Sequence, residues 1–416
     1  MKLKKKIPLR ETPALYKVLL PPGDPDPMEG LQLQFESDAD ESEDDLKPTN
    51  FNQAVTWATD WTTETIVLQL QRGVIDLNPN FQRRDAWRQA RKSRFIESLI
   101  LGLPIPQIVL AERPEKRGTY LVIDGKQRLL TLKQFCGVDD LAVGESERFI
   151  LSDLPVEKKL NGKSYKDLLN EPQLNEKLSA FRSQTIRTVV IKNWPNEDFL
   201  YTVFLRLNSN SVPLSPQELR KALHPGLFIN FVEQASANSK ALQHALGLTN
   251  PDFRMRDVEI AIRYFAFRRN ISNYRGNLKE FLDNICKDLN KRWNIEQATI
   301  RSQFEEFENA IKLTESVFGK AKSFRKYADG KYETRLNRAV FDICLYYFSL
   351  KKYAEKVDAK KAKIKEAFEC LCTEDLEFLR SLETSTKTTD VVKKRFEAWG
   401  RCLSQVLAVP FVSPFR

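Results

Sequence analysis

The predicted β-strands of this 416-residue chain all lie in its first half. Apolar runs rich in β-branched residues predict strands at residues 107–111, 119–123 and 184–191. Beyond Gly226 only helical spacing remains, and it predicts helices at about residues 257–268, 277–293, 295–318, 334–350, 359–380 and 388–407. Strands that are followed by a long run of helices indicate an α+β fold.

The same pattern predicts the domain organisation. Residues 1–50 contain a turn cluster between Pro21 and Pro27 and an acidic run, and we expect a disordered leader. Residues 51–225 are expected to form an α+β domain with a small mixed sheet. Residues 226–416 are expected to form an all-α domain.

Three helices are predicted within the α+β part. Residues 61–72 and 88–101 have helical spacing, and a glycine follows each stretch. Residues 196–207 form the third helical stretch. Ser215, Pro216 and Glu218 then have the spacing of an N-cap, a first helical residue and the acid of a capping box, so a further helix should begin there. Residues 137–182 give no clear assignment.

A strand–turn–helix corner is predicted around Asp124. An apolar run ends in Asp124, Gly125 supplies a turn, and Lys126, Gln127 and Arg128 open a helical pattern. The N-terminus of a helix presents backbone N–H groups and the positive end of the helix dipole, which suits a phosphate. Asp124 is placed to hold Mg²⁺ or to orient a water molecule. The structural alternative is an N-capping Asp124 with a solvated basic turn.

The charge distribution favours polyanionic partners. Residues 36–45 contain seven acidic residues and no basic ones, so the remainder carries +17 when the net charge is +10. A basic body favours DNA, RNA or nucleotides. Basic residues interleaved with Trp87 form a candidate DNA-backbone contact, or else a solvated helix face: Arg83, Arg84, Arg88, Arg91, Lys92 and Arg94.

Cysteine and histidine usage excludes several classes of protein. Six scattered cysteines without a C-x-x-C pair suggest small buried residues in a reducing compartment. Two histidines, His224 and His244, are too few for a zinc hydrolase or for an HNH nuclease, which needs histidine as base and ligand. Apolar runs of membrane-spanning length are absent, so we expect a cytoplasmic protein without a membrane partner.

Several motifs occur in the order found in one known family. Asp124–Arg128 resembles an Asp-Gly-Gln-Gln-Arg signature that follows a strand. Blocks before and after it have matching residues: Gln82, Arg83 and Trp87; Ile96, Glu97 and Ser98; Gly102 to Pro106; Asn208; Leu214 to Arg220; Arg254 to Glu259; and Asn337 to Phe341. Together they resemble the N-terminal domain of GmrSD-type restriction endonucleases, in the ParB/sulfiredoxin-like superfamily.

This resemblance implies a compact ParB-like α+β domain with the signature loop at a nucleotide site. Members act in restriction of foreign or modified DNA, and some couple NTP hydrolysis to a nuclease module. The sequence departs from the family in two ways. Lys126 replaces a neutral amide of the signature, so its charge either strengthens phosphate binding or lies in water. The histidines of an HNH module are missing, so cleavage would need another chemistry or a separate nuclease or effector subunit.

Roles for the site residues follow from their chemistry. Asp124 would bind Mg²⁺ or orient the attacking water, and Gly125 would let the backbone approach a phosphate. Gln127 and Arg128 would contact phosphate oxygens, with Lys126 beside them. A salt bridge from Arg128 to a nearby acid such as Glu97 is the structural alternative. The remaining candidates would close or support the pocket: Gln82, Arg83, Asn208 and Arg220.

The sequence therefore supports three hypotheses. The first is a Mg²⁺-dependent NTPase of a DNA restriction or phage-defence system. The second is a DNA-binding or partner-docking module without enzymatic activity. The third is a direct Mg²⁺-dependent nuclease, in which Asp124 and Lys126 would form half of an acid-x-Lys site and Asp76 or Asp85 would supply the second acid. The nucleotide, the DNA specificity and the oligomeric state are left open.

Overall fold

The computed structural model describes residues 53–75, 77, 87–138, 149–207, 215–383 and 388–416. These residues all belong to one compact unit of the fold. The predicted disordered leader lies outside the described residues. So do five residues that the sequence analysis considered for the site: Asp76, Gln82, Arg83, Asp85 and Asn208.

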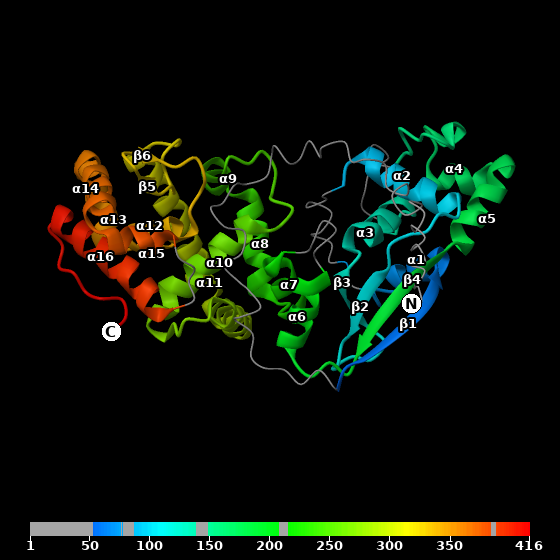
Figure 1. The fold of residues 1–416 in the computed structure, drawn as a ribbon, viewed down its shortest axis with the longest axis horizontal. Helices are drawn as coiled ribbons and strands as arrows, with labels where there is room; N and C mark the ends of the chain where they lie inside the picture. Colours follow the sequence, from blue (N-terminus) through cyan, green and yellow to red (C-terminus); the bar gives the residue numbers. More distant parts are fainter. Residues whose placement is uncertain (1–52, 76, 78–86, 139–148, 208–214, 384–387) are drawn as a thin grey trace, which may run out of the picture. The chain divides into compact units, whose positions relative to one another are not determined.

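A four-stranded mixed sheet forms the first part of the fold (Figure 1). Its spatial order is β1 (Val55–Thr62), β4 (Thr185–Lys192), β2 (Ile108–Glu112) and β3 (Tyr120–Asp124). β4 pairs with β1 in antiparallel and with β2 in parallel orientation, and β2 and β3 form an antiparallel hairpin. The small mixed sheet expected from the sequence is therefore confirmed.

β1 is a strand that the sequence analysis did not predict. Its last residues, Trp61 and Thr62, were assigned to a helix over residues 61–72, whereas α1 spans Thr63–Gln71. Thr62 sets this boundary because its hydroxyl accepts the N–H of Thr65 at 3.1 Å as the N-cap of α1.

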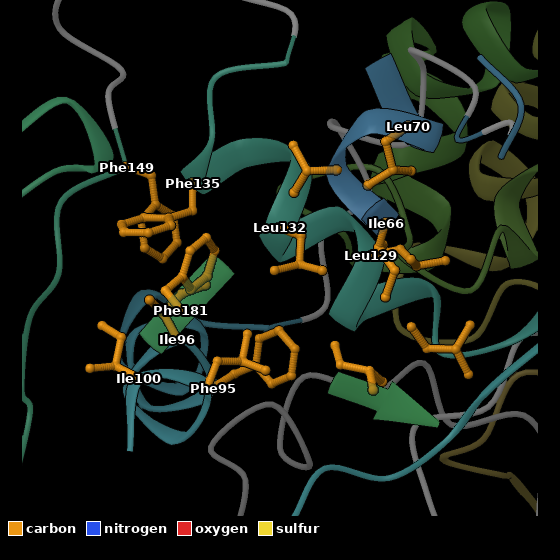
Figure 2. Packing of buried hydrophobic residues seen from close by; sticks show 14 of the residues in the cluster. Ile66, Leu70, Phe95, Ile96, Ile100, Leu129, Leu132, Phe135, Phe149 and Phe181 are labelled. Atoms are coloured by element: carbon orange, nitrogen blue, oxygen red, sulfur yellow. The ribbon is translucent and has the colours of Figure 1, made fainter. Parts of the chain in front are cut away.

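Both faces of the sheet are covered by apolar side chains, because successive strand residues point to opposite sides. One face, with Ile108, Leu110 and Ile186, joins a core with three helices that are packed together in Figure 2: α1, α2 (Gln89–Ile100) and α3 (Lys126–Phe135). The other face, with Val109 and Ile191, packs against residues of α6 (Glu197–Leu207) and α7 (Pro216–Leu223). The hairpin that ends at Asp124 is thus held from both sides.

The segment that resisted assignment joins the end of α3 to β4. It contains α4 (Tyr165–Asn170) and α5 (Asn175–Ser183), with short 3₁₀ turns at Lys158–Leu160 and Pro172–Leu174. The ring of Phe135 at the end of α3 contacts those of Phe149, Tyr165 and Phe181 at centroid distances of 5.4, 5.5 and 5.5 Å. Figure 2 shows Phe135, Phe149 and Phe181 gathered in this way. These contacts anchor the C-terminal end of α3.

The capping box predicted at Ser215 is confirmed. The Ser215 hydroxyl accepts the N–H of Glu218 at 3.1 Å, and a Glu218 oxygen accepts the N–H of Ser215 at 2.7 Å. Pro216 is the first residue of α7, as expected.

Helices dominate the remainder of the described chain, as predicted. They are α8 (Leu227–Asn238), α9 (Lys240–Leu246), α10 (Arg256–Asn270), α11 (Leu278–Phe318), α12 (Arg338–Phe348), α13 (Lys351–Val357), α14 (Lys361–Glu374), α15 (Leu376–Glu383) and α16 (Thr389–Leu407), with 3₁₀ turns at Ile271–Asn273 and Asp358–Lys360. The α+β class is therefore confirmed.

Several helix boundaries differ from the prediction. α8 and α9 were not predicted, and α11 is one helix of 41 residues where two were expected. The helix expected over residues 359–380 is divided at Asp375, whose carboxylate accepts the N–H groups of Glu377 and Phe378 and so starts α15. A two-residue hairpin, β5 (Tyr327–Ala328) and β6 (Lys331–Tyr332), interrupts the helical region. Among the described residues, every helix is either too short or too polar to cross a bilayer.

Candidate functional site

The candidate site is the corner at which β3 passes into α3. β3 ends at Asp124, Gly125 has a left-handed backbone with φ of 96°, and α3 begins at Lys126. The strand–turn–helix corner expected from the sequence is therefore present. Gly125 has no side chain to bond the first N–H groups, and the first turn contains no acidic residue. This helix start combines N–H groups with the positive end of the dipole, which suits an anion.

Gly125 is required by the packing of the corner as well as by its backbone. A Cβ atom at this position would lie 3.0 Å from Cγ1 of Ile108 and 3.3 Å from Nη2 of Arg128. A φ near +96° is also costly for any residue with a side chain. Packing and backbone conformation therefore both require glycine here, independently of the close approach of a phosphate that was expected from the sequence.

Arg128 connects three segments of the corner. Its Nη2 donates hydrogen bonds to Oδ2 of Asp124 and to the backbone oxygen of Gln107, both at 2.9 Å. The Arg128 side chain is 8% exposed and that of Asp124 is 24% exposed. Nε of Arg128 is buried and has no hydrogen-bond partner in the described part of the chain. Burial lowers the pKa of Arg128, Asp124 opposes that effect, and the nearby charge of Arg91 adds to it.

The salt bridge to a nearby acid that was considered as a structural alternative for Arg128 is present. It forms with Asp124 and not with Glu97, whose carboxylate accepts the N–H groups of Val156 and Glu157 at 3.0 and 2.7 Å. The alternative of an N-capping Asp124 with a solvated turn is wrong. Gly125 is the cap residue, and Lys126 and Arg128 are both buried.

Lys126 is buried in an ion pair with Glu218 of α7. The two side chains are 6% and 5% exposed. The sequence analysis expected the charge of Lys126 either to bind phosphate or to lie in water. The expectation that it lies in water is wrong, and an internal partner was not considered. Gln127 is half-buried in the same turn, and its backbone oxygen accepts the hydroxyl of Thr131 at 2.7 Å.

α2 contributes a second basic helix start beside the corner. Its first turn contains Arg91, which is exposed and lies over the Trp87 ring at 4.8 Å from the centroid. Trp87 in turn contacts Phe95 at a ring distance of 5.7 Å. Arg91 and Arg128 are each the third residue of their helix, and the charge of Arg91 is near enough to lower the pKa of Arg128. The positive charges of Arg91 and Arg128 therefore influence each other near the start of α3.

A known protein family matches the part of the chain that contains this corner. Residues 64–225 match the family described as the GmrSD restriction endonuclease, N-terminal domain. The chain carries a GmrSD N-terminal domain. This confirms the resemblance, and a domain of this family is typical of restriction or phage-defence systems. No curated protein matches the chain.

Arg220, expected to support the pocket, lies in the last part of the GmrSD N-terminal domain and has a partner beyond it. Its Nε donates to Oδ1 of Asp283 in α11 at 2.7 Å, and its Nη1 donates to Oε1 of Gln217 at 2.9 Å. Burial opposes ionisation of Asp283, but Arg220, His224 and Lys279 outweigh it and hold the pKa of Asp283 well below its ordinary value. These contacts connect Arg220 to α11.

Metal ligands are sparse in the described residues of the GmrSD N-terminal domain and of the helices after it. Nowhere in these residues do three His, Cys, Asp or Glu side chains form a group that would hold a metal ion. Asp124 is thus a single candidate ligand. This fits Mg²⁺ better than zinc, because Mg²⁺ is commonly held by one or two carboxylates together with phosphates and water.

The sequence predicted one of the two roles of Glu218 and missed the other. The Ser-x-x-Glu spacing identified it as a helix cap, and it does cap α7. Its pairing with Lys126 was indicated in the sequence only indirectly, by the lysine that replaces a neutral amide in the signature. A lysine that becomes buried needs an acidic partner.

Proposed function

We propose that this protein binds the phosphate groups of a nucleoside triphosphate at the Asp124 corner and hydrolyses it with Mg²⁺, as part of a DNA restriction or phage-defence system. The observation that carries the proposal is the start of α3, which has no acidic residue in its first turn and lies near enough to Arg91 for that charge to lower the pKa of Arg128. An anion between these guanidinium groups would offset their repulsion and interact with the dipole of α3.

Asp124 is the residue proposed to hold Mg²⁺. Its carboxylate is partly exposed, and Arg128 fixes one of its oxygens at 2.9 Å. Bound next to a phosphate, Mg²⁺ would polarise the phosphoryl oxygens and neutralise developing charge. In this arrangement Arg128 orients Asp124 directly. Gln127, half-buried in the same turn, is the residue proposed to contact phosphate oxygens.

DNA cleavage is proposed to belong to a separate nuclease or effector subunit. His224 is buried, 3.5 Å from Glu197 and 3.7 Å from Asp283, and His244 pairs with Glu315 at 2.9 Å. Both histidines are therefore engaged in the helical region and do not supply the base of an HNH site. A direct nuclease that uses Lys126 against the phosphate is disfavoured, since Lys126 is paired with Glu218.

One observation favours a second function, DNA binding without catalysis. Arg88, the N-cap of α2, and Arg91 and Arg94 within the helix are exposed, and Arg91 lies over the Trp87 ring. Such a row of cations with an aromatic side chain suits a nucleic-acid backbone. This reading needs no role for Asp124.

Phosphate release from a panel of NTPs with Mg²⁺, with and without duplex DNA, tests the proposal. Asp124→Asn keeps an oxygen for Arg128 but removes the charge, so turnover should fall at least about a hundredfold while the fold remains. Asp60→Asn is the control, because Asp60 is an exposed acid of β1 paired with Arg187. Equal turnover in wild type and Asp124→Asn would contradict the proposal. Absent turnover together with salt-sensitive DNA retention in both proteins would favour the binding module.

A further inference from the structure

Glu218 uses both of its carboxylate oxygens inside the protein. Oε2 accepts the N–H of Ser215 at 2.7 Å, and Oε1 is paired with Nζ of Lys126. Ninety-two positions separate Lys126 and Glu218 in the sequence. A single buried side chain therefore starts α7 and also holds the first residue of α3.

The charge of Lys126 is compensated before any anion reaches the corner. If Lys126 turned toward a phosphate, Glu218 would remain as a buried carboxylate without its cation. Breaking a buried ion pair in this way is strongly unfavourable. Lys126 is consequently a poor candidate for a phosphate ligand, although it lies in the first turn of α3.

Buried ion pairs also fix α7 on its other sides. Arg220 pairs with Asp283 of α11, and Lys221 pairs with Glu233 of α8. Together with Glu218, three charged residues of this eight-residue helix pair with three different helices. These pairs fix the position of α7, and Glu218 therefore holds Lys126 from a helix that is itself held in place.

We propose that Lys126 and Glu218 form a positioning pair that fixes the first turn of α3 against α7 and so keeps its N–H groups in place for phosphate. This inference rests on the proposed phosphate site. It explains how the corner retains its geometry although Lys126 replaces the neutral amide of the family signature. The cation of Lys126 is paired with the carboxylate of Glu218, so the pair adds little net charge to the turn.

A double-mutant cycle tests the pair with little disturbance of the fold. Lys126→Gln restores the neutral amide, and Glu218→Gln keeps an oxygen for the capping box. Binding of inorganic tripolyphosphate with Mg²⁺, measured by calorimetry, should weaken about tenfold in each single variant, because each removes one charge of the buried Lys126–Glu218 pair and keeps the other. The double variant should bind within about threefold of wild type, since a Gln–Gln contact leaves no unpaired charge.

A phosphate ligand would behave differently. If Lys126 contacted phosphate, the double variant would bind as weakly as Lys126→Gln, and that result would overturn the inference. Lys133→Gln is the matched control, because Lys133 is a buried lysine in the last turn of the same helix. Adding Glu218→Gln to Lys133→Gln should not restore tripolyphosphate binding. If Lys126→Gln fails to fold, Glu218→Gln and the double variant still give the comparison.

Amide hydrogen exchange separates this inference from the proposed function. Exchange at Leu129 and Leu130 in the ligand-free protein should accelerate in both single variants and return to the wild-type rate in the double variant. If wild type binds no polyphosphate, the proposed function fails, and the exchange pattern still decides whether the pair fixes the turn. Unchanged exchange in the single variants would overturn the positioning role.

Discussion

Asp124 and Arg128 form an ion pair across the start of α3, with 2.9 Å between Oδ2 and Nη2. The same Nη2 donates to the backbone of Gln107, the residue before β2. One guanidinium group therefore connects the end of β3, the first turn of α3 and the beginning of β2. The carboxylate that we propose as the Mg²⁺ ligand is oriented by this group.

Arg128→Gln should destabilise the protein. The variant loses two hydrogen bonds from a buried cation and leaves Asp124 without its partner, so the free energy of unfolding should fall by about 2–3 kcal/mol. Urea unfolding followed by circular dichroism measures this change. NTP turnover should fall as well, because Asp124 would no longer be oriented. If the variant has the wild-type free energy of unfolding, the hydrogen bonds of Arg128 do not stabilise the fold.

Gly125→Ala should cost more stability than Gly118→Ala. Both glycines have positive φ, 96° and 76°, but a Cβ at Gly118 meets nothing within 4 Å. Gly118→Ala therefore reports the backbone cost alone, about 1–2 kcal/mol. Gly125→Ala adds contact with Ile108 and Arg128, which should cost about 1–3 kcal/mol more. Equal free energies of unfolding for the two variants would mean that the corner tolerates the extra methyl group.

Arg91→Gln should weaken anion binding without loss of stability. Arg91 is exposed, so its charge should contribute up to about 1 kcal/mol to binding, or about fivefold in the affinity for tripolyphosphate with Mg²⁺. Arg187→Gln is the charge-matched control, because Arg187 is an exposed residue of β4 that pairs with Asp60. Calorimetry at low salt compares the two. If both variants lose the same affinity, Arg91 acts only through the net charge of the protein.

Local sequence signals predicted the corner and the α7 cap. The turn after Asp124 and the Ser215–Glu218 capping box are each specified within a few adjacent residues, so both were predictable. β1 was missed because Trp61 fits helical spacing, and only the cap bond of Thr62 shows where α1 begins. The single helix α11 was predicted as two helices, over residues 277–293 and 295–318. Ile295 is instead an exposed residue within that helix.

Partners in the site were not predictable in the same way. Glu218 lies 92 positions from Lys126, and Asp283 lies 63 positions from Arg220. No local pattern specifies such pairs, because they depend on how α7 packs against α3 and α11. The sequence indicated which residues carry the chemistry of the corner. Tertiary packing decides which of their charges are compensated internally.

Asp283→Asn should lower stability at neutral pH and have a smaller effect in acid. Arg220, His224 and Lys279 hold the folded-state pKa of Asp283 below its unfolded value of about 3.9. This stabilisation is therefore complete above about pH 4 and is lost as the pH falls below that value. At pH 7 the variant should lose about 3 kcal/mol, since it removes the buried carboxylate that pairs with both Arg220 and Lys279. Asp288→Asn, at a partly exposed acid of the same helix, should change stability by less than about 0.5 kcal/mol. Urea unfolding between pH 2.5 and 7 measures both variants, and a constant difference between Asp283→Asn and wild type over that range would contradict the depressed pKa.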